Sequence, residues 1–211
     1  MVSAREEILD RLKTVRNKRG EIADEKPDFT SSVYLPLHED LAEEFGKKIE
    51  LAGGKLFRTK TIEEAVAQLQ NIIEKNQWQN IFCKDQILQK YLSGKIEYSS
   101  DDQSFGTMQV GITRCEYLIA HLGSVLVSSG QPSGRRLNVF PEIQVIFATE
   151  NQLIDYLENG LERIKEKYAG NMPSLISFIT GASRTADIEK TLVKGMHGPK
   201  SVLVFLCKKT F

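Results

Sequence analysis

The segment LISFITGASRTADIEKTLVKGMHGPKSVLVFL, residues 175–206, places a polar, glycine-containing middle between two apolar runs. Its first run, Leu175 to Ile179, predicts a buried strand, and the loop from Gly181 to Asp187 then leads into a short helical pattern. A strand followed at once by a helix start gathers backbone N–H groups and the positive end of a helix dipole. The second run predicts another buried strand after Pro199. This order is typical of an α/β fold and predicts an anion site at the strand-to-helix loop 181–187.

The predicted ligand groups of this loop are a glycine, two hydroxyls, a guanidinium and a carboxylate. Gly181 permits a close approach, Ser183 and Thr185 supply hydroxyls, and Arg184 offers a bidentate donor to a carboxylate or phosphate. Alternatively, Ser183 or Thr185 only caps the helix and Asp187 complements its dipole. Glycine-bearing turns on both sides of one short helix favour the ligand site, with Asp187 included.

Candidates for catalysis are few. Asp187, Glu189 and His197 are the groups that could serve as an acid, a base or a carboxylate nucleophile. His197 lies in a Gly-His-Gly-Pro turn, which backbone geometry alone can require. The catalytic residues therefore stay unassigned.

A second polar cluster lies in the middle of the chain. Gly123 and Ser124 stand where a predicted helix meets a predicted strand, and the loop 128–136 carries no charge before Arg135 and Arg136. Such a loop suits ligand binding over a sheet edge, although adjacent arginines also fit a solvated surface pair. Gly123, Ser124 and Arg135 are therefore added to the ligand-binding candidates.

The rest of the chain alternates strand and helix patterns, which indicates a largely parallel sheet covered by helices. A capping box at Ser3 and Glu6 opens an N-terminal helix, and the irregular connector after it divides the chain into residues 1–36 and 37–211. The remaining helices are predicted at 37–52, from 61, at 86–92, at 115–122 and from 149, and the remaining strands at 55–58, 80–83, 96–98, 109–113, 124–129 and 142–148.

Composition excludes several functions. Because 28 basic and 28 acidic residues cancel, no global field attracts nucleic acid or an anionic membrane. The three cysteines, Cys83, Cys115 and Cys207, are far apart and form no C-x-x-C pair, which argues against a disulfide framework or a metal site of this chain. Without a bilayer-length apolar stretch or a secretory signal, we expect a cytoplasmic protein with no membrane span.

The run from Gly181 to Pro199 resembles the C-terminal motif of the LUD-domain family, in the group of lactate utilization protein C. The family pattern there is close to G-x-S-x-T-A-D-I-E followed by G-x-H-G-P. Residues 111–136 resemble the family's central segment, and the likeness covers roughly residues 37 to 206. The chain departs from the family at two positions. His121 stands where the family tends to have an acidic residue, just before a Thr-Gly-Thr motif. Gln144 stands where the family often has the histidine of a Pro-Pro-x-His segment.

The resemblance implies a three-layer α/β/α sandwich like that of the NagB/RpiA/CoA-transferase group, here with an N-terminal helical extension. It also implies a role beside iron–sulfur proteins in oxidising L-lactate to pyruvate. In that role this chain carries no cofactor of its own, the clusters lie on partner subunits, and the ligand is a small carboxylate or phosphate. Two alternatives remain: a stand-alone enzyme of the isomerase, CoA-transferase or folate cyclo-ligase type, and an interaction module that docks through its N-terminal helix.

Overall fold

The structure is a computed structural model that describes residues 3–18, 34, 36–185, 193–195 and 197–211. The chain divides into two units, residues 1–36 and 37–211. The first contains helix α1, Ala4–Lys18. Its start has the predicted capping box, because Ser3 N–H donates to Glu6 Oε2 (2.8 Å) and Glu6 N–H donates to Ser3 Oγ (3.3 Å).

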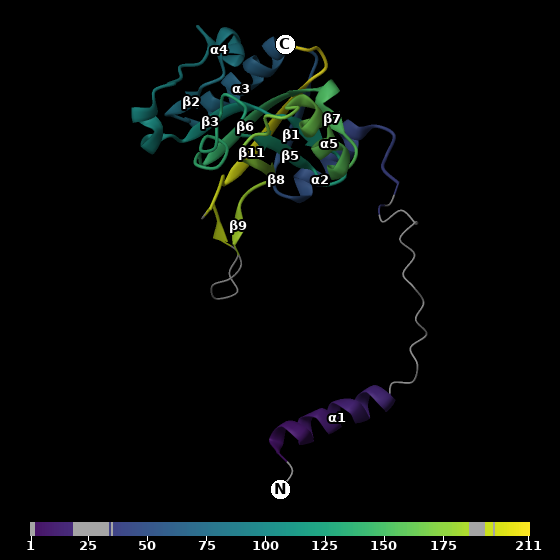
Figure 1. Cartoon of the computed structure of the whole chain (residues 1–211). Helices are drawn as coiled ribbons and strands as arrows, with labels where there is room; N and C mark the ends of the chain where they lie inside the picture. The colour runs from purple at the N-terminus through teal and green to yellow at the C-terminus, as the bar shows by residue number, and fades with distance from the viewer. Residues whose placement is uncertain (1–2, 19–33, 35, 186–192, 196) are drawn as a thin grey trace. The chain divides into compact units, whose positions relative to one another are not determined.

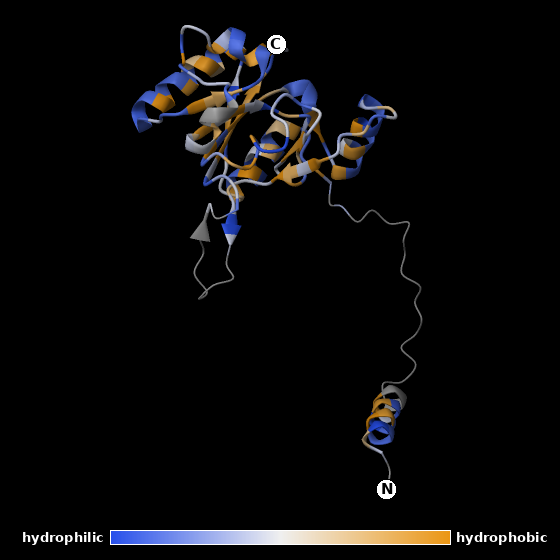
Figure 2. Cartoon of the chain, turned by 60° about the vertical axis from the view of Figure 1, so that its left-hand side comes forward, coloured by the Kyte–Doolittle hydropathy of each residue, from blue (hydrophilic) through white to orange (hydrophobic). Residues whose placement is uncertain are grey.

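The core of the second unit is a sheet of five parallel strands in the order β1-β11-β6-β3-β2 (Figure 1). Every residue of β6 is buried, and so are all but the first of β11. Strands that are covered on both faces read as continuous apolar runs, which is why the sequence predicted them (Figure 2). The five strands are β1 (Lys55–Thr59), β2 (Ile81–Cys83), β3 (Val110–Arg114), β6 (Ile143–Thr149) and β11 (Ser201–Cys207).

Helices α3 (Ile62–Asn76) and α4 (Gln86–Leu92) cover one face of this sheet. They pack on alternate strand residues such as Phe147 and Phe205, whose rings stack with centroids 5.3 Å apart. The other face carries helix α2 (Leu41–Leu51) together with a second sheet. The predicted parallel sheet is therefore confirmed, and one of its faces is covered by strands as well as a helix.

The second sheet is mixed and has the order β7-β4-β5-β8. Strand β5 pairs antiparallel with both β4 and β8, while β4 pairs parallel with β7. One face of this sheet packs on the parallel sheet, and the other packs on helix α5 (Leu157–Lys167). The strands are β4 (Tyr117–Ile119), β5 (Ser124–Ser128), β7 (Leu153–Ile154) and β8 (Ile176–Ile179).

Two predicted helices differ from the structure in this region. The helix expected over residues 115–122 is wrong, because strand β4 occupies its middle and satisfies its backbone by pairing with β5 and β7. The helix expected from Thr149 starts later. The capping box of Thr149 and Gln152 closes a 3₁₀ turn (Glu150–Gln152), and strand β7 follows before α5 begins at Leu157.

Two short features complete the described chain. A 3₁₀ helix spans Asp102–Thr107, and β9 (Arg184–Thr185) pairs antiparallel with β10 (Val193–Lys194). Figures 1 and 2 show β9 extending away from the two larger sheets. In the described part of the chain, no helix has the length and apolar character needed to cross a membrane.

Candidate functional site

At residues 181–185 the structure shows a loop that leads into a short strand, and the short helix predicted after them falls on residues 186–192, which lie outside the described residues. Arg184 and Thr185 form strand β9, and the peptide groups around them are already paired. The N–H of Ser183 donates to the carbonyl of Pro199 at 2.8 Å. Because the N–H of Ser183 is bonded to Pro199, it is not available to a ligand. Because Arg184 and Thr185 form a strand, these two residues supply no helix dipole.

Gly181 is required by packing against helix α2. Its φ of +67° lies in the left-handed region, and a Cβ added there would lie 2.2 Å from the carbonyl oxygen of Ala52. Gly123 makes a similar approach, with φ +62° and a Cβ position 2.4 Å from the backbone nitrogen of Ile49. Both glycines therefore let a loop lie directly on α2.

Arg184 lies at the carboxyl end of helix α2. Its Nη2 donates to the carbonyl of Leu51 at 3.4 Å, in the last turn of that helix. A cation is stabilising at this end because the final carbonyls lack intrahelical partners and carry the negative end of the dipole. The guanidinium thus has a structural partner outside the predicted anion site, and half-buried Thr185 belongs to the β9 ladder.

The candidates from the middle of the chain are also held by structural contacts. Ser124 is fully buried, and its Oγ lies 2.6 Å from Thr180 Oγ1. Arg135 Nη2 donates to Ser174 Oγ at 2.6 Å. Ser124 therefore holds the Thr180 hydroxyl in place, and Arg135 joins the loop after β5 to the loop before β8.

A cleft beside strand β8 nevertheless collects several predicted residues. We call it the β8 cleft: it has a volume of about 260 Å³ and is lined by residues 138–139, 177–183 and 197–199. Gly181, Ser183 and His197 come together in this lining, and His197 is exposed. Among the described residues that line the cleft, none is acidic. Asp187 and Glu189 lie outside the described residues.

The β8 cleft lies near the amino-terminal edge of the parallel sheet. Pro199 precedes strand β11, and the N–H groups of Lys200 and Ser201 donate to the carbonyl of Glu142, just before β6. Open α/β sheets usually bind ligands at the opposite, carboxyl edge. The loop does follow the carboxyl end of β8, as predicted, but β8 belongs to the mixed sheet.

Asn138 is a residue of this cleft that the sequence did not single out. It is 3% exposed, and its Nδ2 donates to Ser133 Oγ and to the carbonyl of Gly134, each at 3.2 Å. Its Oδ1 has no hydrogen-bond partner among the described residues. A lone asparagine after a Ser-Gly turn carries no recognisable pattern, so this acceptor becomes visible only in three dimensions.

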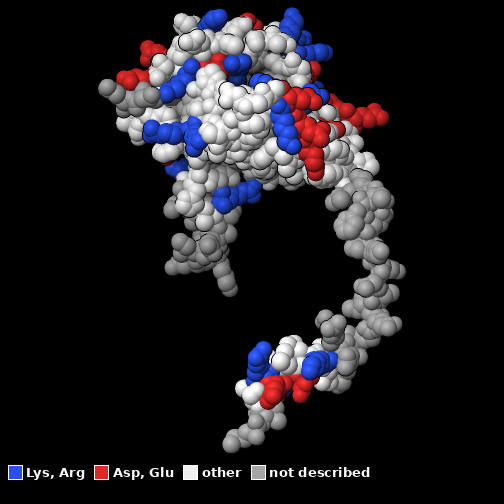
Figure 3. All heavy atoms as spheres, in the orientation of Figure 1, with Lys and Arg blue, Asp and Glu red and all other residues white. Residues whose placement is uncertain are grey.

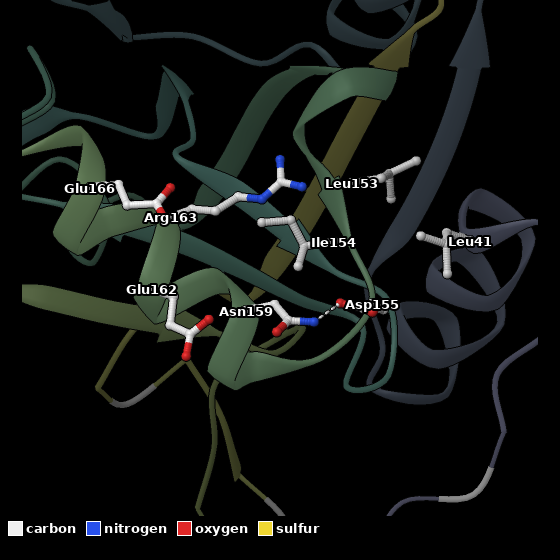
Figure 4. A pocket seen from close by; sticks show the side chains of 8 residues that line it. All are labelled: Leu41, Leu153, Ile154, Asp155, Asn159, Glu162, Arg163 and Glu166. Carbon is white, nitrogen blue, oxygen red and sulfur yellow. Dashed lines mark hydrogen bonds between the residues drawn. The ribbon is translucent and has the colours of Figure 1, made fainter.

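A second cleft, of about 370 Å³, lies between β7, α5 and the start of α2 (Figure 4). Its polar lining includes the carboxylates of Asp155, Glu162 and Glu166, with Arg163 between them. Figure 3 shows acidic side chains gathered over this part of the surface. Since three carboxylates face one guanidinium, the cleft repels anions, and the β8 cleft is the better candidate for an anionic ligand.

Asp155 in this acidic cleft has a structural role. Desolvation raises the pKa of its carboxyl, but hydrogen bonds from Asn159 Nδ2 (2.6 Å) and the Tyr156 N–H (2.7 Å) lower it to a value below the ordinary one. The carboxylate is thereby fixed in its ionised form at the start of α5.

Comparison with known proteins identifies the family. The family model of the LUD domain matches residues 42–207, which is most of the chain. The chain belongs to the LUD domain family. The resemblance seen in the run from Gly181 to Pro199 is thus confirmed, and the match covers both sheets of this LUD domain.

Curated relatives match about two-fifths of this chain. A Halalkalibacterium halodurans protein named lactate utilization protein C is 35% identical over 92 residues, which are 43% of this chain and 40% of that protein. The Bacillus subtilis protein of the same name is 34% identical over 92 residues, 43% of this chain and 38% of its own. Escherichia coli YkgG is 36% identical over 93 residues, 43% and 40% of the two chains. The matched segment therefore spans well under half of each relative.

A solved structure shares the fold of this LUD domain. It is a DUF162 family protein from Deinococcus radiodurans, with a TM-score of 0.60 and 16% sequence identity. The match covers 82% of this chain and 99% of the other. The Deinococcus radiodurans protein therefore has a similar α/β fold.

A buried ion pair lies apart from the β8 cleft in this LUD domain. The side chain of Glu116 is fully buried, and its Oε2 accepts from Lys167 Nζ at 2.6 Å. Its Oε1 accepts from Ser128 Oγ and from the Tyr168 hydroxyl, each also at 2.6 Å. Burial lowers the pKa of Lys167, but the contacts with Glu116 outweigh it and raise that pKa above its ordinary value. The pair therefore ties the end of α5 to the residue before β4, and the Ser128 hydrogen bond joins strand β5 to the same carboxylate.

The three thiols of the LUD domain are free and buried. Burial raises the pKa of Cys83 to about 12, and it raises the pKa values of Cys115 and Cys207 as well. Over the described residues, no three His, Cys, Asp or Glu side chains come together as a metal site. These cysteines thus do not fit the ligand set of an iron–sulfur cluster.

We expect the native thiols to resist alkylation. Because the thiolate is the reactive form, Cys83, Cys115 and Cys207 should react with iodoacetamide on the order of a hundredfold more slowly than a free thiol. Mass spectrometry of the native and the urea-unfolded chain measures this, with the unfolded chain as the control that takes up three labels. Rapid labelling of one cysteine in the native chain would contradict the burial described here.

Proposed function

We propose that this LUD domain is a subunit of a lactate-oxidising system and that it binds a small carboxylate in the β8 cleft. The relatives named lactate utilization protein C support the first part. The cleft supports the second, because its described lining combines the hydroxyl of Ser183 and the imidazole of His197 with no acidic side chain. Its volume of about 260 Å³ admits a small metabolite.

In this proposal the chain binds the carboxylate substrate, and other subunits receive the electrons. Oxidation of L-lactate to pyruvate releases two electrons, and iron–sulfur clusters on partner subunits would take them up. The buried and separated thiols of Cys83, Cys115 and Cys207 give this chain no comparable role. The proposal includes the reducing cytoplasm as the location, because the three cysteines are free. It also includes the grouping of the fold with the NagB/RpiA/CoA-transferase proteins, which the family resemblance supports.

Each polar group of the cleft has a part in binding. Ser183 Oγ donates to a carboxylate oxygen, and a ring N–H of His197 donates from the exposed side of the cleft. Gly181 holds the loop on α2, and Ser124 positions Thr180. We assign Arg184, Thr185 and Arg135 to the support of the surrounding loops, because none of them lines the cleft.

Calorimetric titration of the purified chain with L-lactate, pyruvate and inorganic phosphate tests this function. We expect saturable binding of a carboxylate, and Ser183→Ala should weaken it about tenfold or more through loss of a hydrogen bond to a charged group. Arg184→Ala is the matched control from the same loop and should bind as the unmodified chain does.

The result that contradicts the proposal is equally clear. If no carboxylate binds, or if Arg184→Ala abolishes binding while Ser183→Ala does not, the β8 cleft is not the site. Turnover of a substrate by the chain without partner proteins would instead favour the stand-alone enzyme. Among the candidate catalytic groups for such an enzyme, His197 belongs to the described residues and lines the cleft, whereas Asp187 and Glu189 lie outside the described residues.

A further inference from the structure

Another cleft lies at the amino-terminal end of strand β2, and we call it the Trp78 cleft. It forms where the end of helix α3 meets the start of β2 and the segment after helix α4. Its volume is about 300 Å³, and its lining consists of residues 70, 73–74, 78–81 and 95–97. None of these residues lines the β8 cleft, so a ligand bound here occupies a second site.

The floor of the Trp78 cleft is apolar. Ile81 and Ile96 are buried members of the core cluster on this side of the parallel sheet, and half-buried Trp78 packs against that cluster. Trp78 is the single tryptophan of the chain. Because an indole ring attracts other flat rings by stacking, this floor favours a planar ligand.

The backbone of residues 78–80 is fixed by hydrogen bonds. The N–H of Gln79 donates to Gln109 Oε1 at 2.7 Å, and the N–H of Gln109 donates to the carbonyl of Asn80 at 3.1 Å. Asn80 has a φ of +50°, in the left-handed region that asparagine tolerates better than most residues. The side chains of Gln79 and Asn80 are exposed, and no described residue forms a hydrogen bond with either. Two carboxamides on a fixed segment are therefore available to a ligand.

The charges of the lining limit what this cleft can bind. The carboxylates of Glu74 and Glu97 outnumber the ammonium group of Lys95. A phosphate is therefore repelled, whereas hydroxyl groups can donate to the two carboxylates. The lining thus favours an uncharged ligand that carries hydroxyl groups beside a flat ring, and the volume suits a molecule of that size.

We propose that the Trp78 cleft binds a purine nucleoside, with its base stacked on Trp78 and the edge of the base bonded to the carboxamide of Asn80. A carboxamide presents a donor and an acceptor side by side, and this pair matches the N6 and N7 atoms of adenine. The hydroxyls of the sugar donate to the carboxylates of the lining. This ligand goes beyond the proposed function, because it binds a different cleft from the small carboxylate and needs no partner protein.

Tryptophan fluorescence of the full chain tests the proposal. Because Trp78 is the only tryptophan, its emission reports on this cleft alone. The probes are adenosine, AMP and D-ribose, and N-acetyltryptophanamide is the control for light absorbed by the probes. We expect adenosine to quench the emission with saturation, since its base covers the indole. AMP should bind several-fold more weakly because of its phosphate, and D-ribose, which has no base, should cause no saturable change.

Two glycine variants assign the binding to its residue. Asn80→Gly removes the carboxamide but keeps the left-handed backbone, because glycine adopts a positive φ readily. It should weaken adenosine binding about tenfold or more. Gln77→Gly is the matched control: Gln77 is exposed and has a φ of +54°, but it does not line the Trp78 cleft. This variant should bind adenosine as the unmodified chain does.

Several results would overturn the proposal. Absence of quenching by adenosine, or an equal response to D-ribose, excludes a stacked base, and so does calorimetric binding of adenosine that leaves the fluorescence unchanged. Tighter binding of AMP than of adenosine contradicts an uncharged ligand. If Asn80→Gly binds as the unmodified chain does, or if Gln77→Gly loses as much affinity, the carboxamide does not read the base. Should Asn80→Gly fail to fold, the three probes on the unmodified chain still decide.

Discussion

Replacing Lys167 by methionine is expected to lower the free energy of unfolding by about 2–3 kcal/mol. The change leaves the fully buried carboxylate of Glu116 without its ammonium partner, 2.6 Å away. Removing one member of a buried ion pair usually costs more, but the Lys167 side chain is 50% exposed, so solvent already screens part of the attraction. Urea unfolding followed by circular dichroism measures the loss.

A double-mutant cycle shows whether this cost comes from the pair. Glu116→Gln removes the buried charge, and in that background Lys167→Met should cost less than it does alone. The pH dependence provides a second test. Desolvation of Lys167 is outweighed by its contacts with Glu116, which raise the pKa of Lys167. The stabilisation by Lys167 is therefore present at neutral pH and is lost as the pH rises through that pKa, so the deficit of Lys167→Met should shrink in strongly alkaline solution. Additive costs and a deficit that stays the same at high pH would contradict the ion pair.

The sequence predicted the elements whose signal is local and long. Strands β6 and β11 were found because each is a continuous apolar run, and helix Gln86–Leu92 was found with the bounds that the structure shows. Strand β4 was missed because a run of three residues, Tyr117–Ile119, has no measurable period. What decides its conformation is pairing with β5 and β7, and that pairing cannot be seen in the run itself.

The same limit explains why the two short strands on either side of residues 186–192 were missed. Strands β9 and β10 have two residues each, too few for any pattern. The chain around them is fixed by longer-range bonds, from Ser183 N–H to Pro199 and from Gly195 N–H to Ser183. The helical pattern predicted after Thr185 lies outside the described residues and stays a prediction.

The candidate site was predicted in part. The polar turns containing Gly181, Ser183 and His197 do meet in one cleft, because the bond from Ser183 to Pro199 brings their loops together. Arg184 was interpreted as a ligand group, but its partner is a carbonyl 133 positions earlier, at the end of a helix. Asn138 was missed for the opposite reason: the burial of its side chain and the lack of a donor to its Oδ1 among the described residues have no counterpart in sequence spacing.

Gly181→Ala separates the two roles that a glycine in this loop could have. We expect it to lower the free energy of unfolding by about 2–4 kcal/mol, because two costs add. A φ of +67° is unfavourable for alanine, and the new Cβ would lie 2.2 Å from the carbonyl oxygen of Ala52, so the loop or the end of α2 must shift. Thermal and urea unfolding of the purified variant measure the effect.

Gly134→Ala is the matched control for this substitution. Its φ of +60° is nearly the same, but nothing lies within 4 Å of the added Cβ, so only the backbone cost of about 1 kcal/mol applies. The difference between the two variants therefore isolates the contact with α2. If Gly181→Ala cost no more than Gly134→Ala, the loop would have room for a side chain at position 181. Its glycine would then have to be explained by ligand access rather than by packing on the helix.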